Sequence, residues 1–448
     1  MAGELSATIA RFAADCRHGD IPADVLHEGK RALLNAFATA LAACREPGVL
    51  GVQAVFERFR APGDCTVIGH ARGTDMLHAA SLNAMRMNVF DYDDTHIPTI
   101  LHPTAPVAPA LFALAQRRRI HGRDLLAAFV LGVEIECRLA NAVSPWHYQR
   151  GWHITSTCGV FGAAMAAGSL LGLDAQRQLW ALGHAAAQSS GLVETLGTTA
   201  KSVGVGNAAS NGLLSALLAA EGCGGPQSPL EGARGFLPVM GEAADPAALL
   251  DRLGTQWELK NNTYKPYPCG VVLNPVIEAC LSLHHRDGVR LADVVAVELS
   301  GHPLLRERTD RPPPRSGRES QVSARHAVAV ALERGQAGLD AFSDAGVAAT
   351  AAAAQRLALT FRDDASFGVE AAAVRLQLAD GSVRAHHVQV ARGSLAQPLA
   401  DADLEAKLRE LCAWGGSGCD AGALIEALWA IDTTDDAGAA MRRSAAPA

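Results

Sequence analysis

The sequence is poor in aromatic residues, in lysine and in long runs of one charge or of apolar residues. Aromatic residues make up only 5% of the 448. The formal net charge is −7, and no block of five or more basic residues occurs, which argues against a nucleic acid or an anionic membrane as the main partner. No run reaches the ~18 uninterrupted apolar residues of a membrane span. The first twenty residues include Glu4 and lack the apolar core of a secretory signal. We therefore expect a cytoplasmic protein.

Motifs for metals, disulfides and redox cofactors are also missing from the sequence. The ten cysteines are scattered, with no Cys-x-x-Cys motif and no histidine pair at zinc-finger spacing. They are expected to be reduced, buried thiols that pack as small hydrophobic groups. Hydrophobic residues make up 49% of the chain and charged residues 19%, so a large packed core is expected. The length suggests two or three domains at roughly 150 residues each.

The hydrophobic pattern changes near residue 260. Before that point, apolar residues recur at three- and four-residue spacing, as in amphipathic helices. After it, residues 289–303 and 369–391 alternate like strands, with a tight turn predicted at Asp380-Gly381, and helices are expected at 324–335, 344–359 and 403–416. The last dozen residues are expected to be frayed. The helices predicted before residue 260 cover residues 24–44, 76–92, 104–119, 123–143, 155–173, 175–193 and 207–222.

This pattern predicts a mainly α protein with an α+β part. The expected large all-helical domain comprises residues 1–260 and 396–448. A smaller α+β domain is expected over residues 261–395.

The densest polar cluster lies in residues 89–105. It contains three carboxylates within four positions and two histidines. Charged groups of this kind are costly in the interior, so we expect them to be exposed to water, paired with opposite charges or employed in catalysis or binding. A solvated helix end is one alternative. A Mg²⁺ site of the kind found in helical terpene cyclases is another, but those enzymes need aromatic pockets that this composition does not supply. The polar residues are Asp91, Asp93, Asp94, Thr95, His96, His102 and Thr104.

Two further segments introduce a histidine and a lysine at the start of expected helices. His153 lies in Gly-Trp-His-Ile-Thr-Ser-Thr (151–157), where it could act as a neutral base or could simply cap or pack the helix. Lys201 and Gly204 lie in a glycine-rich stretch (198–208). The lysine precedes the glycines, so the stretch is not a phosphate P-loop, but it could hold an anion at a helix N-terminus. A surface lysine beside a turn is the alternative.

A second lysine stands at the expected domain junction. Lys265 lies within residues 261–270, where Pro266 and Pro268 restrict the chain. A plain linker is one interpretation, and a cleft between domains is the other. Two lysines, two histidines and nearby carboxylates suit a small polycarboxylate, because proton removal beside a carboxylate needs a tuned base and fixed cations.

Several of these segments together resemble the MmgE/PrpD family, which includes 2-methylcitrate dehydratase, cis-aconitate decarboxylase and iminodisuccinate epimerase. The resemblance extends from about residue 5 to about residue 435. It implies a large helical domain with a smaller α+β lid, a homodimer, and no metal or organic cofactor. The motifs that carry it are FDYDDTHIPTILHPTAPVAPAL, GWHITSTCGVFGAA, LVETLGTTAKSVGVGNAASNG, EGARGF and KPYPCG.

The resemblance also implies the residues that line a pocket between the two domains. The lysines would bind carboxylates of the substrate, the two histidines would serve as base and acid, Asp91 would orient a histidine, and Thr95 would hydrogen-bond the substrate. Asp94, Gly204, Asn274 and Arg325 are further expected substrate contacts. The implied pocket residues are Asp91, Thr95, His102, His153, Lys201 and Lys265.

Two positions depart from the family pattern. His326, in Ser323-Ala324-Arg325-His326, stands where many members have a tyrosine, and Asn274 stands where many have a histidine. A histidine can titrate near neutral pH, so His326 is expected to be a possible proton carrier. Both changes fall where a decarboxylase or a methylcitrate dehydratase is expected to recognise its substrate or deliver a proton.

The resemblance therefore predicts a cofactor-independent lyase that acts on a small di- or tricarboxylate, of the hydro-lyase type and similar to 2-methylcitrate dehydratase. An isomerase similar to iminodisuccinate epimerase and a decarboxylase of the cis-aconitate type are alternatives, because all three begin with a stabilised carbanion. A non-catalytic binding protein on the same fold is an alternative from another class.

Overall fold

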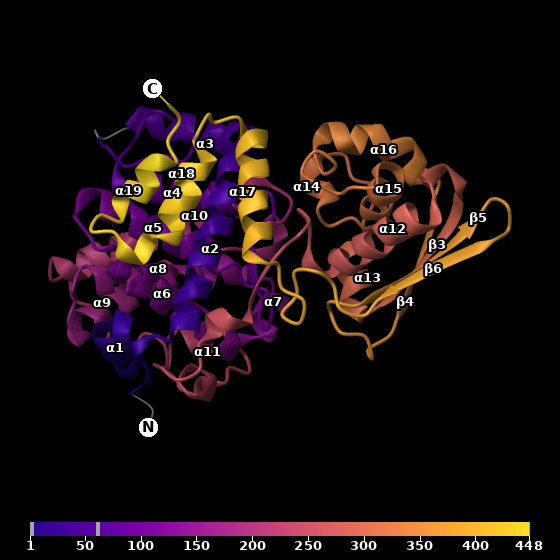
Figure 1. Ribbon diagram of the computed structural model, residues 1–448. Coiled ribbons are helices and arrows are strands. Elements are labelled where there is room, and N and C mark those ends of the chain that lie inside the picture. Colours follow the sequence, from indigo (N-terminus) through magenta and orange to yellow (C-terminus); the bar gives the residue numbers. More distant parts are fainter. Residues whose placement is uncertain (1–3, 60–62, 448) are drawn as a thin grey trace. The chain divides into compact units, whose positions relative to one another are not determined.

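The computed structural model describes residues 4–59 and 63–447, and its chain divides into two compact units (Figure 1). The helical unit comprises Met1–Val89, Asp93–Asn262 and Ala400–Ala448. The sheet unit comprises Phe90–Tyr92 and Thr263–Leu399. From the sequence we predicted boundaries at 260/261 and 395/396, whereas the division falls at Asn262/Thr263 and Leu399/Ala400 and assigns three residues near position 91 to the sheet unit.

The helical unit is built from fourteen described α-helices and one short strand, β1 (Asp94–His96). Most of the helices follow one another through short turns, as expected for neighbours in a helical domain. The helices are α1 (Leu5–Asp15), α2 (Ala23–Ala42), α3 (Pro47–Phe56), α4 (Met76–Asn88), α5 (Thr104–Arg117), α6 (Gly122–Val143), α7 (Trp146–Gln149), α8 (Ile154–Leu170), α9 (Ala175–Ala186), α10 (Thr199–Ala220), α11 (Phe236–Met240), α17 (Asp401–Gly415), α18 (Ala421–Trp429) and α19 (Gly438–Arg443). Short 3₁₀ turns cover His18–Asp20, Ala43–Arg45, Glu57–Phe59, Val193–Thr195, Pro246–Leu249, Glu258–Asn261 and Ile431–Thr433.

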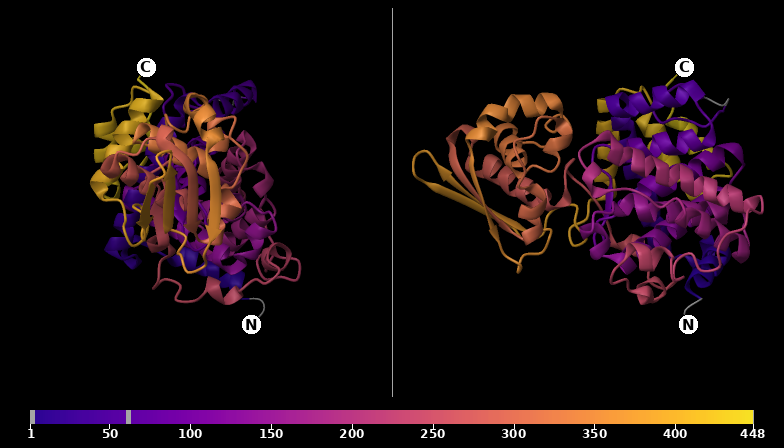
Figure 2. Two further views of the ribbon diagram at one scale, coloured as in Figure 1. Left: turned by 90° about the vertical axis from the view of Figure 1, so that its right-hand side faces the viewer. Right: turned by 180° about the vertical axis from the view of Figure 1, so that it is seen from behind.

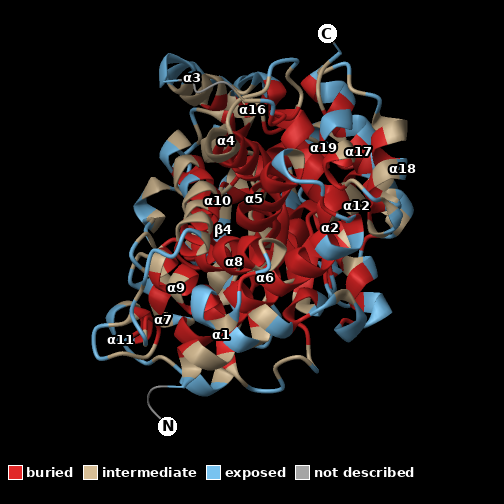
Figure 3. Ribbon diagram, turned by 90° about the vertical axis from the view of Figure 1, so that its left-hand side faces the viewer, coloured by how far each residue is buried: buried red, intermediate tan, exposed pale blue. Residues whose placement is uncertain are grey.

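Helix α8 forms the centre of this unit. Every residue from Ile154 to Gly168 is buried, and α8 packs against α5, α6, α9 and α10 (Figure 3). Small residues let the helices approach closely. At Gly212 of α10, an added Cβ would lie 2.4 Å from the Cβ of Ala163 on α8. A helix that is apolar or small on every side is stable only when neighbours cover it, and α8 satisfies this condition.

Among the described helices, only α10 is long and apolar enough to cross a membrane by length and composition. It packs against α4, α8 and α9, and half of its most apolar window is buried. This environment is that of a core helix in a globular domain.

The sheet unit consists of a four-stranded sheet with helices packed on it (Figure 2). The strand order is β4-β3-β5-β6; β3 pairs parallel with β4 and antiparallel with β5, and β5 pairs antiparallel with β6. Alternate residues of β3 and β5 face a core shared with α12 and α15, which explains their period-two pattern. The elements are β2 (Asn262–Tyr264), which continues the chain from the helical unit, α12 (Asn274–Asp287), β3 (Val294–Gly301), α13 (Pro303–Thr309), α14 (Gly317–Ser320), α15 (Ala324–Arg334), α16 (Asp344–Arg356), β4 (Ala358–Asp363), β5 (Ala372–Leu378) and β6 (Val383–Val388), with 3₁₀ turns at Val271–Leu273 and Leu291–Asp293.

The expected fold class is confirmed, and so is the β5–β6 hairpin, whose turn residue Gly381 has a φ of 82°. Four expectations are wrong in detail. Helix α9 ends at Ala186, α10 begins at Thr199, and residues 358–363 form a strand. The expected frayed C-terminus instead contains α19, where Met441 is buried and the carbonyl of Ser444 accepts a hydrogen bond from the backbone N–H of Gly69.

The close approach of α8 and α10 predicts opposite effects for the same substitution at two helical glycines. Gly212→Ala forces a methyl group into the α8–α10 contact and should lower the free energy of unfolding by about 1–3 kcal/mol. Gly51→Ala, in α3 with nothing within 4 Å of the new Cβ, should raise it by about 0.5–1 kcal/mol. Urea unfolding followed by circular dichroism measures both. Equal effects at the two positions would show that the α8–α10 contact is loose.

Candidate functional site

A buried pair of carboxyl groups lies at β1. Asp94 Oδ2 accepts hydrogen bonds from the Thr104 hydroxyl and from Asn262 Nδ2, which is 2.7 Å away. Asp93 Oδ2 accepts a hydrogen bond from Asn88 Nδ2 at 2.6 Å. Burial, reinforced by the neighbouring Asp93 carboxylate, raises the pKa of Asp94 to about 7, even though its hydrogen bonds favour the ionised form. Near neutral pH, this carboxyl group can therefore hold or release a proton.

His102 is held by the loop that follows β1. Its Nδ1 lies 2.7 Å from the backbone carbonyl oxygen of Asp94 and 3.6 Å from Asp93 Oδ1. A carbonyl oxygen only accepts hydrogen bonds, so Nδ1 carries the proton and the lone pair of the neutral ring is on Nε2. The Thr95 hydroxyl lies 3.4 Å from the same Nδ1, and the backbone N–H of His102 donates to Thr155 Oγ1 of α8. These contacts bring Thr95 and His102 to the beginning of α8.

His153 lies at the N-terminal end of α8, one residue before its first turn. The ring is buried, and its Nδ1 lies 2.8 Å from Ser156 Oγ. Its carbonyl oxygen accepts backbone hydrogen bonds from Ser156 and Thr157, so the helix itself fixes the histidine backbone. Because the serine hydroxyl can donate or accept, either tautomer of the His153 ring is compatible with this contact.

Lys201 occupies the first turn of α10, which lies beside the first turn of α8. The lysine is 7% exposed. One turn further along α10, an added Cβ at Gly204 would lie 3.0 Å from Ser156 Oγ, the partner of His153. The glycine-rich stretch is therefore helical rather than the loop that the sequence suggested, and Gly204 serves close packing instead of forming a loop cradle. A buried ammonium group at a helix N-terminus attracts anions, because the positive end of the helix dipole adds to its charge there.

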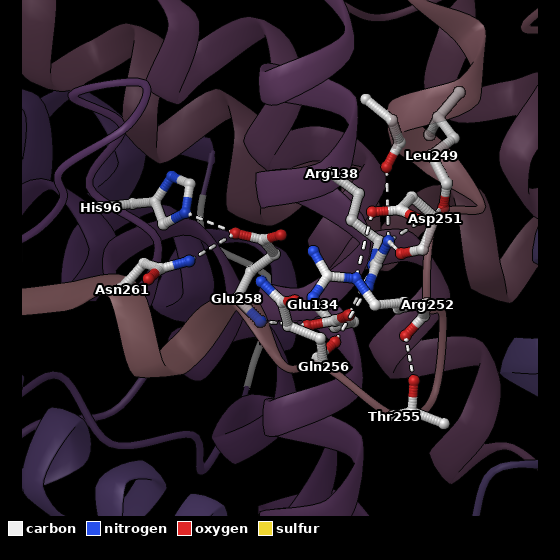
Figure 4. A network of polar contacts seen from close by, with 11 residues as sticks. His96, Glu134, Arg138, Leu249, Asp251, Arg252, Thr255, Gln256, Glu258 and Asn261 are labelled. Carbon is white, nitrogen blue, oxygen red and sulfur yellow. Dashed lines mark hydrogen bonds and ion pairs between the residues drawn. The ribbon is translucent and has the colours of Figure 1, made fainter.

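A network of charged groups contacts β1 at His96, the last residue of the strand (Figure 4). His96 Nε2 lies 3.0 Å from Glu258 Oε2, and the backbone N–H of Glu258 donates to Glu134 Oε2 at 2.6 Å. Glu134 forms an ion pair with Arg138, whose guanidinium also donates to several backbone carbonyls of residues 248–256. Although burial raises the pKa of Glu258, the hydrogen bonds from His96 and Asn261 lower it to about 2. This network fixes the strand that carries Asp94 and Thr95.

Glu136 of α6 is a buried acid that no motif in the sequence indicates. Its side chain is fully buried, and neither carboxyl oxygen has a hydrogen-bond partner among the described residues. Burial and the nearby Asp94 raise its pKa well above the usual value, so the protonated form is favoured. Its carboxyl group lies against Gly162 of α8, where an added Cβ would be 2.6 Å from Oε2. Ser156, Thr155, Thr104 and Asn262 are further supporting residues to which the sequence analysis assigned no role.

In the sheet unit, Asp91 and Lys265 form an ion pair. Lys265 Nζ lies 3.2 Å from Asp91 Oδ1 and 3.0 Å from the backbone oxygen of the same residue. Asp91 has a φ of 51°, a left-handed conformation that aspartate adopts more readily than most residues. Asp91 was expected to orient a histidine. Its carboxylate contacts Lys265 Nζ, and the expected role of orienting a histidine stays a prediction.

Asn274 and Arg325 are the other expected substrate contacts of the sheet unit. Asn274 begins α12, and its Oδ1 lies 3.8 Å from Cys269 Sγ. Arg325 donates to the carbonyl oxygens of Ala354 and Leu357 at the end of α16, a position that suits a cation near a helix C-terminus.

His326 is fully enclosed in the sheet unit. Its Nε2 donates to the backbone oxygen of Ala341 at 2.8 Å, and its ring packs edge-on against Phe342. Burial lowers its pKa to about 4, partly offset by the bond to Ala341. The ring is therefore neutral at pH 7 and does not titrate there as the sequence suggested.

Within the helical unit, the group nearest to a metal site is the pair of Asp93 Oδ1 and His102 Nδ1. Nδ1 already donates to the Asp94 carbonyl oxygen, and a protonated nitrogen cannot ligate a metal. The same pair of groups is placed to move a proton, because Nδ1–H lies within reach of a carboxylate oxygen.

The raised pKa of Asp94 predicts a pH dependence of stability. In the unfolded chain the carboxyl group ionises near its model value of 3.8, and in the folded protein near 7. Between these values the unfolded state releases a proton that the folded state retains, so the free energy of unfolding falls as pH rises, by up to about 4 kcal/mol from this group. Asp94→Asn keeps an acceptor for Thr104 and Asn262 and should flatten this part of the profile.

Urea unfolding between pH 4 and pH 8 measures the effect for the wild type and the variant. The difference between the two profiles isolates Asp94 from Glu134 and Glu136, whose pKa values are also raised. Parallel profiles would show that Asp94 is ionised throughout this range.

Comparisons with known proteins agree with the order of these segments. The model of the MmgE/PrpD N-terminal domain matches residues 7–248, and that of the C-terminal domain matches residues 267–432. A cis-aconitate decarboxylase of Aspergillus terreus is 32% identical over 297 residues, covering 63% of this chain and 60% of that protein. The cis-aconitate decarboxylase-like protein oryM of Aspergillus oryzae is 30% identical over 306 residues, covering 65% and 64%.

A human cis-aconitate decarboxylase is 26% identical over 347 residues, covering 74% of this chain and 72% of that protein. The chain spans about three fifths of the length of the first of these relatives. Because the two domain models together match most of the sequence, in the order in which the family arranges them, the chain belongs to the MmgE/PrpD family.

Proposed function

We propose that this protein is a cofactor-independent lyase that acts on a small di- or tricarboxylate, with decarboxylation of a cis-aconitate-like acid as the first reaction to test. The observation that carries the proposal is the shared location of two histidines and a lysine. His102 and His153 both contact the first turn of α8, and Lys201 lies on the adjoining first turn of α10. Relatives named cis-aconitate decarboxylase favour a carboxylate substrate.

His102 is the proposed base. Its Nδ1–H is engaged by the carbonyl oxygen of Asp94, so the neutral ring accepts a proton at Nε2. The Asp93 carboxylate, 3.6 Å from Nδ1, stabilises the imidazolium that forms. This arrangement suits removal of a proton from carbon beside a carboxylate.

His153 is the proposed acid that returns a proton to carbon or to a leaving group. The Ser156 hydroxyl can accept from a protonated Nδ1 or donate to an unprotonated one, so the contact at 2.8 Å is compatible with both states of the ring. A residue that must exchange protons in each turnover needs a partner of this kind.

Lys201 is proposed to bind a substrate carboxylate and to stabilise negative charge as it develops. Its ammonium group is buried, so its attraction for a carboxylate is screened less than it would be in water. Lys265 is proposed as the second cation, with Asp91 holding its ammonium group within the sheet unit. Thr95, beside His102, is proposed to hydrogen-bond the substrate.

Decarboxylation, dehydration of a 2-methylcitrate-like acid and epimerisation are the reactions to be separated. In dehydration and epimerisation, the base first removes a proton from carbon, and the resulting carbanion then loses hydroxide or is reprotonated on its other face. In decarboxylation, loss of CO₂ itself leaves the electron pair on carbon, and the acid supplies the proton. The same lysines stabilise the charge in all three reactions, so these residues do not by themselves choose among them.

A panel of acids incubated with the protein in D₂O distinguishes the reactions by proton NMR. Release of CO₂ from cis-aconitate is expected under the proposal. Loss of water from citrate-like acids, or inversion with deuterium incorporation at an aminosuccinate-like acid, would instead favour the hydro-lyase or the epimerase. A binding protein without activity would cause none of these changes in any acid that it binds.

The proposed role of Lys201 predicts a large kinetic effect. Lys201→Met removes the charge but keeps most of the side-chain volume, and it should lower kcat/KM about 30- to 1,000-fold, equivalent to about 2–4 kcal/mol. Lys265→Met should have an effect of similar size. Lys260→Met is the matched control, because Lys260 is half-exposed and pairs with Asp24. Wild-type kinetics in both Lys201→Met and Lys265→Met would remove the lysines from the mechanism.

The fixed tautomer of His102 predicts a separation of binding from chemistry. For an acid that reacts by loss of a proton from carbon, His102→Gln should lower kcat at least about 100-fold while changing KM little, because general-base catalysis typically contributes about 10²–10⁴-fold. Steady-state kinetics with the active acid from the panel measures this effect. A rise in KM at unchanged kcat would assign His102 to substrate binding instead.

A further inference from the structure

The end of α17 turns back on itself and brings two cysteines together. Cys412 lies in the last turn of α17, and its Sγ is 3.4 Å from the backbone oxygen of Cys419. The side chain of the first cysteine therefore contacts the backbone of the second. Cys419 Sγ also lies 3.2 Å from the backbone oxygen of Arg443, at the end of α19. The pair therefore lies where three C-terminal helices meet.

A glycine-rich turn, Gly415-Gly416-Ser417-Gly418, produces this geometry. Gly415 packs directly on α2, where an added Cβ would lie 1.8 Å from the Leu41 carbonyl oxygen. Gly416 has a φ of 62° and ends the helix in the left-handed conformation. Ser417 Oγ accepts from the backbone N–H of Cys419 and lies 3.8 Å from Cys412 Sγ. The turn thus holds the second cysteine against the first.

Cys412 differs from the other seven buried cysteines of the chain. Seven of the ten are buried thiols whose pKa burial raises, which keeps them in the unreactive protonated form: Cys16, Cys44, Cys65, Cys137, Cys158, Cys269 and Cys280. The neighbouring side chains of Cys419 and Ser417 instead lower the pKa of Cys412, against its burial. Cys419 is only partly buried, so the turn that carries the pair reaches the protein surface at Cys419.

We propose that Cys412 and Cys419 form a dithiol that a hydroperoxide oxidises to an intramolecular disulfide. The Cys412 thiolate attacks the peroxide, so that an S–O bond forms, the O–O bond breaks, and hydroxide leaves and takes up a proton. Cys419 Sγ then attacks the sulfur of Cys412, an S–S bond forms, and water leaves. In total, two thiols and one hydrogen peroxide give one disulfide and two waters.

The disulfide has a structural consequence. It covalently links the last turn of α17 to the residue just before Asp420, the N-cap of α18. It also removes the thiol hydrogen that Cys419 donates to the Arg443 carbonyl oxygen. Oxidation therefore removes the hydrogen bond between Cys419 and the end of α19 and adds a disulfide bond that closes the turn.

Peptide mapping tests this proposal directly. After treatment of the full chain with hydrogen peroxide, alkylation of the denatured protein and digestion with trypsin, both cysteines lie in one peptide, residues 410–442. The expected product is this peptide without alkylation and lighter by two hydrogen atoms, and it should revert with dithiothreitol. Cys44 is the third thiol near this turn, and it falls in a separate peptide. A Cys44–Cys412 disulfide would therefore appear as two linked peptides.

Single variants separate the two steps. Cys419→Ser should stop at the sulfenic acid of Cys412, which dimedone labels, and Cys412→Ser should abolish disulfide formation. Cys223→Ser, at an exposed cysteine, is the matched control and should leave the yield unchanged. Full alkylation of both cysteines after peroxide, or a disulfide to the Cys44 peptide, would overturn the proposal. So would dimedone labelling of Cys223 in place of Cys412 in the Cys419→Ser variant.

Discussion

The close packing of α8 against α10 is the constraint on which the candidate site depends. Alanine and glycine at the contact let the two helices approach closely. A Cβ added at Gly212 would lie only 2.4 Å from the Cβ of Ala163 and would clash with it. This proximity sets the first turns of both helices side by side. His153, Ser156 and Lys201 can therefore occupy one small region without any long loop to position them. Rigid elements hold such groups more accurately than loops do.

Burial then determines how the carboxyl groups near this region behave. Asp94 and Glu136 lie where burial makes ionisation costly, and burial also raises the pKa of Glu134, although its ion pair with Arg138 partly offsets this. The strand that carries Asp94 is fixed on its other side by Glu258, which stays ionised because of its hydrogen bonds. Asp94 and Glu136 thus favour the protonated form, whereas Glu258 stays ionised and holds β1 through its contact with His96.

Local patterns predicted ten of the described helices, some with misplaced ends, and the β5–β6 hairpin, but missed others such as α1 and α12. The sequence failed where tertiary contacts override local preference. The glycines near Lys201 suggested a loop, but packing on Ser156 keeps them helical. Asn262 could not be identified as the partner of Asp94, because 168 positions separate them. The neutral state of His326 depends on its enclosure beside Phe342, which no periodicity reveals.

The helical unit is completed by residues from both ends of the chain. Helix α17 packs on α2, and Lys407 Nζ donates to Asn35 Oδ1 in the buried interface between them. A ribosome synthesises α2 some 370 residues before its partner emerges. During translation, the face of α2 that packs on α17 therefore has no partner until the whole sheet unit has been synthesised. Vectorial synthesis thus gives the inserted unit an opportunity to fold first, and a chaperone that shields α2 would act within that interval.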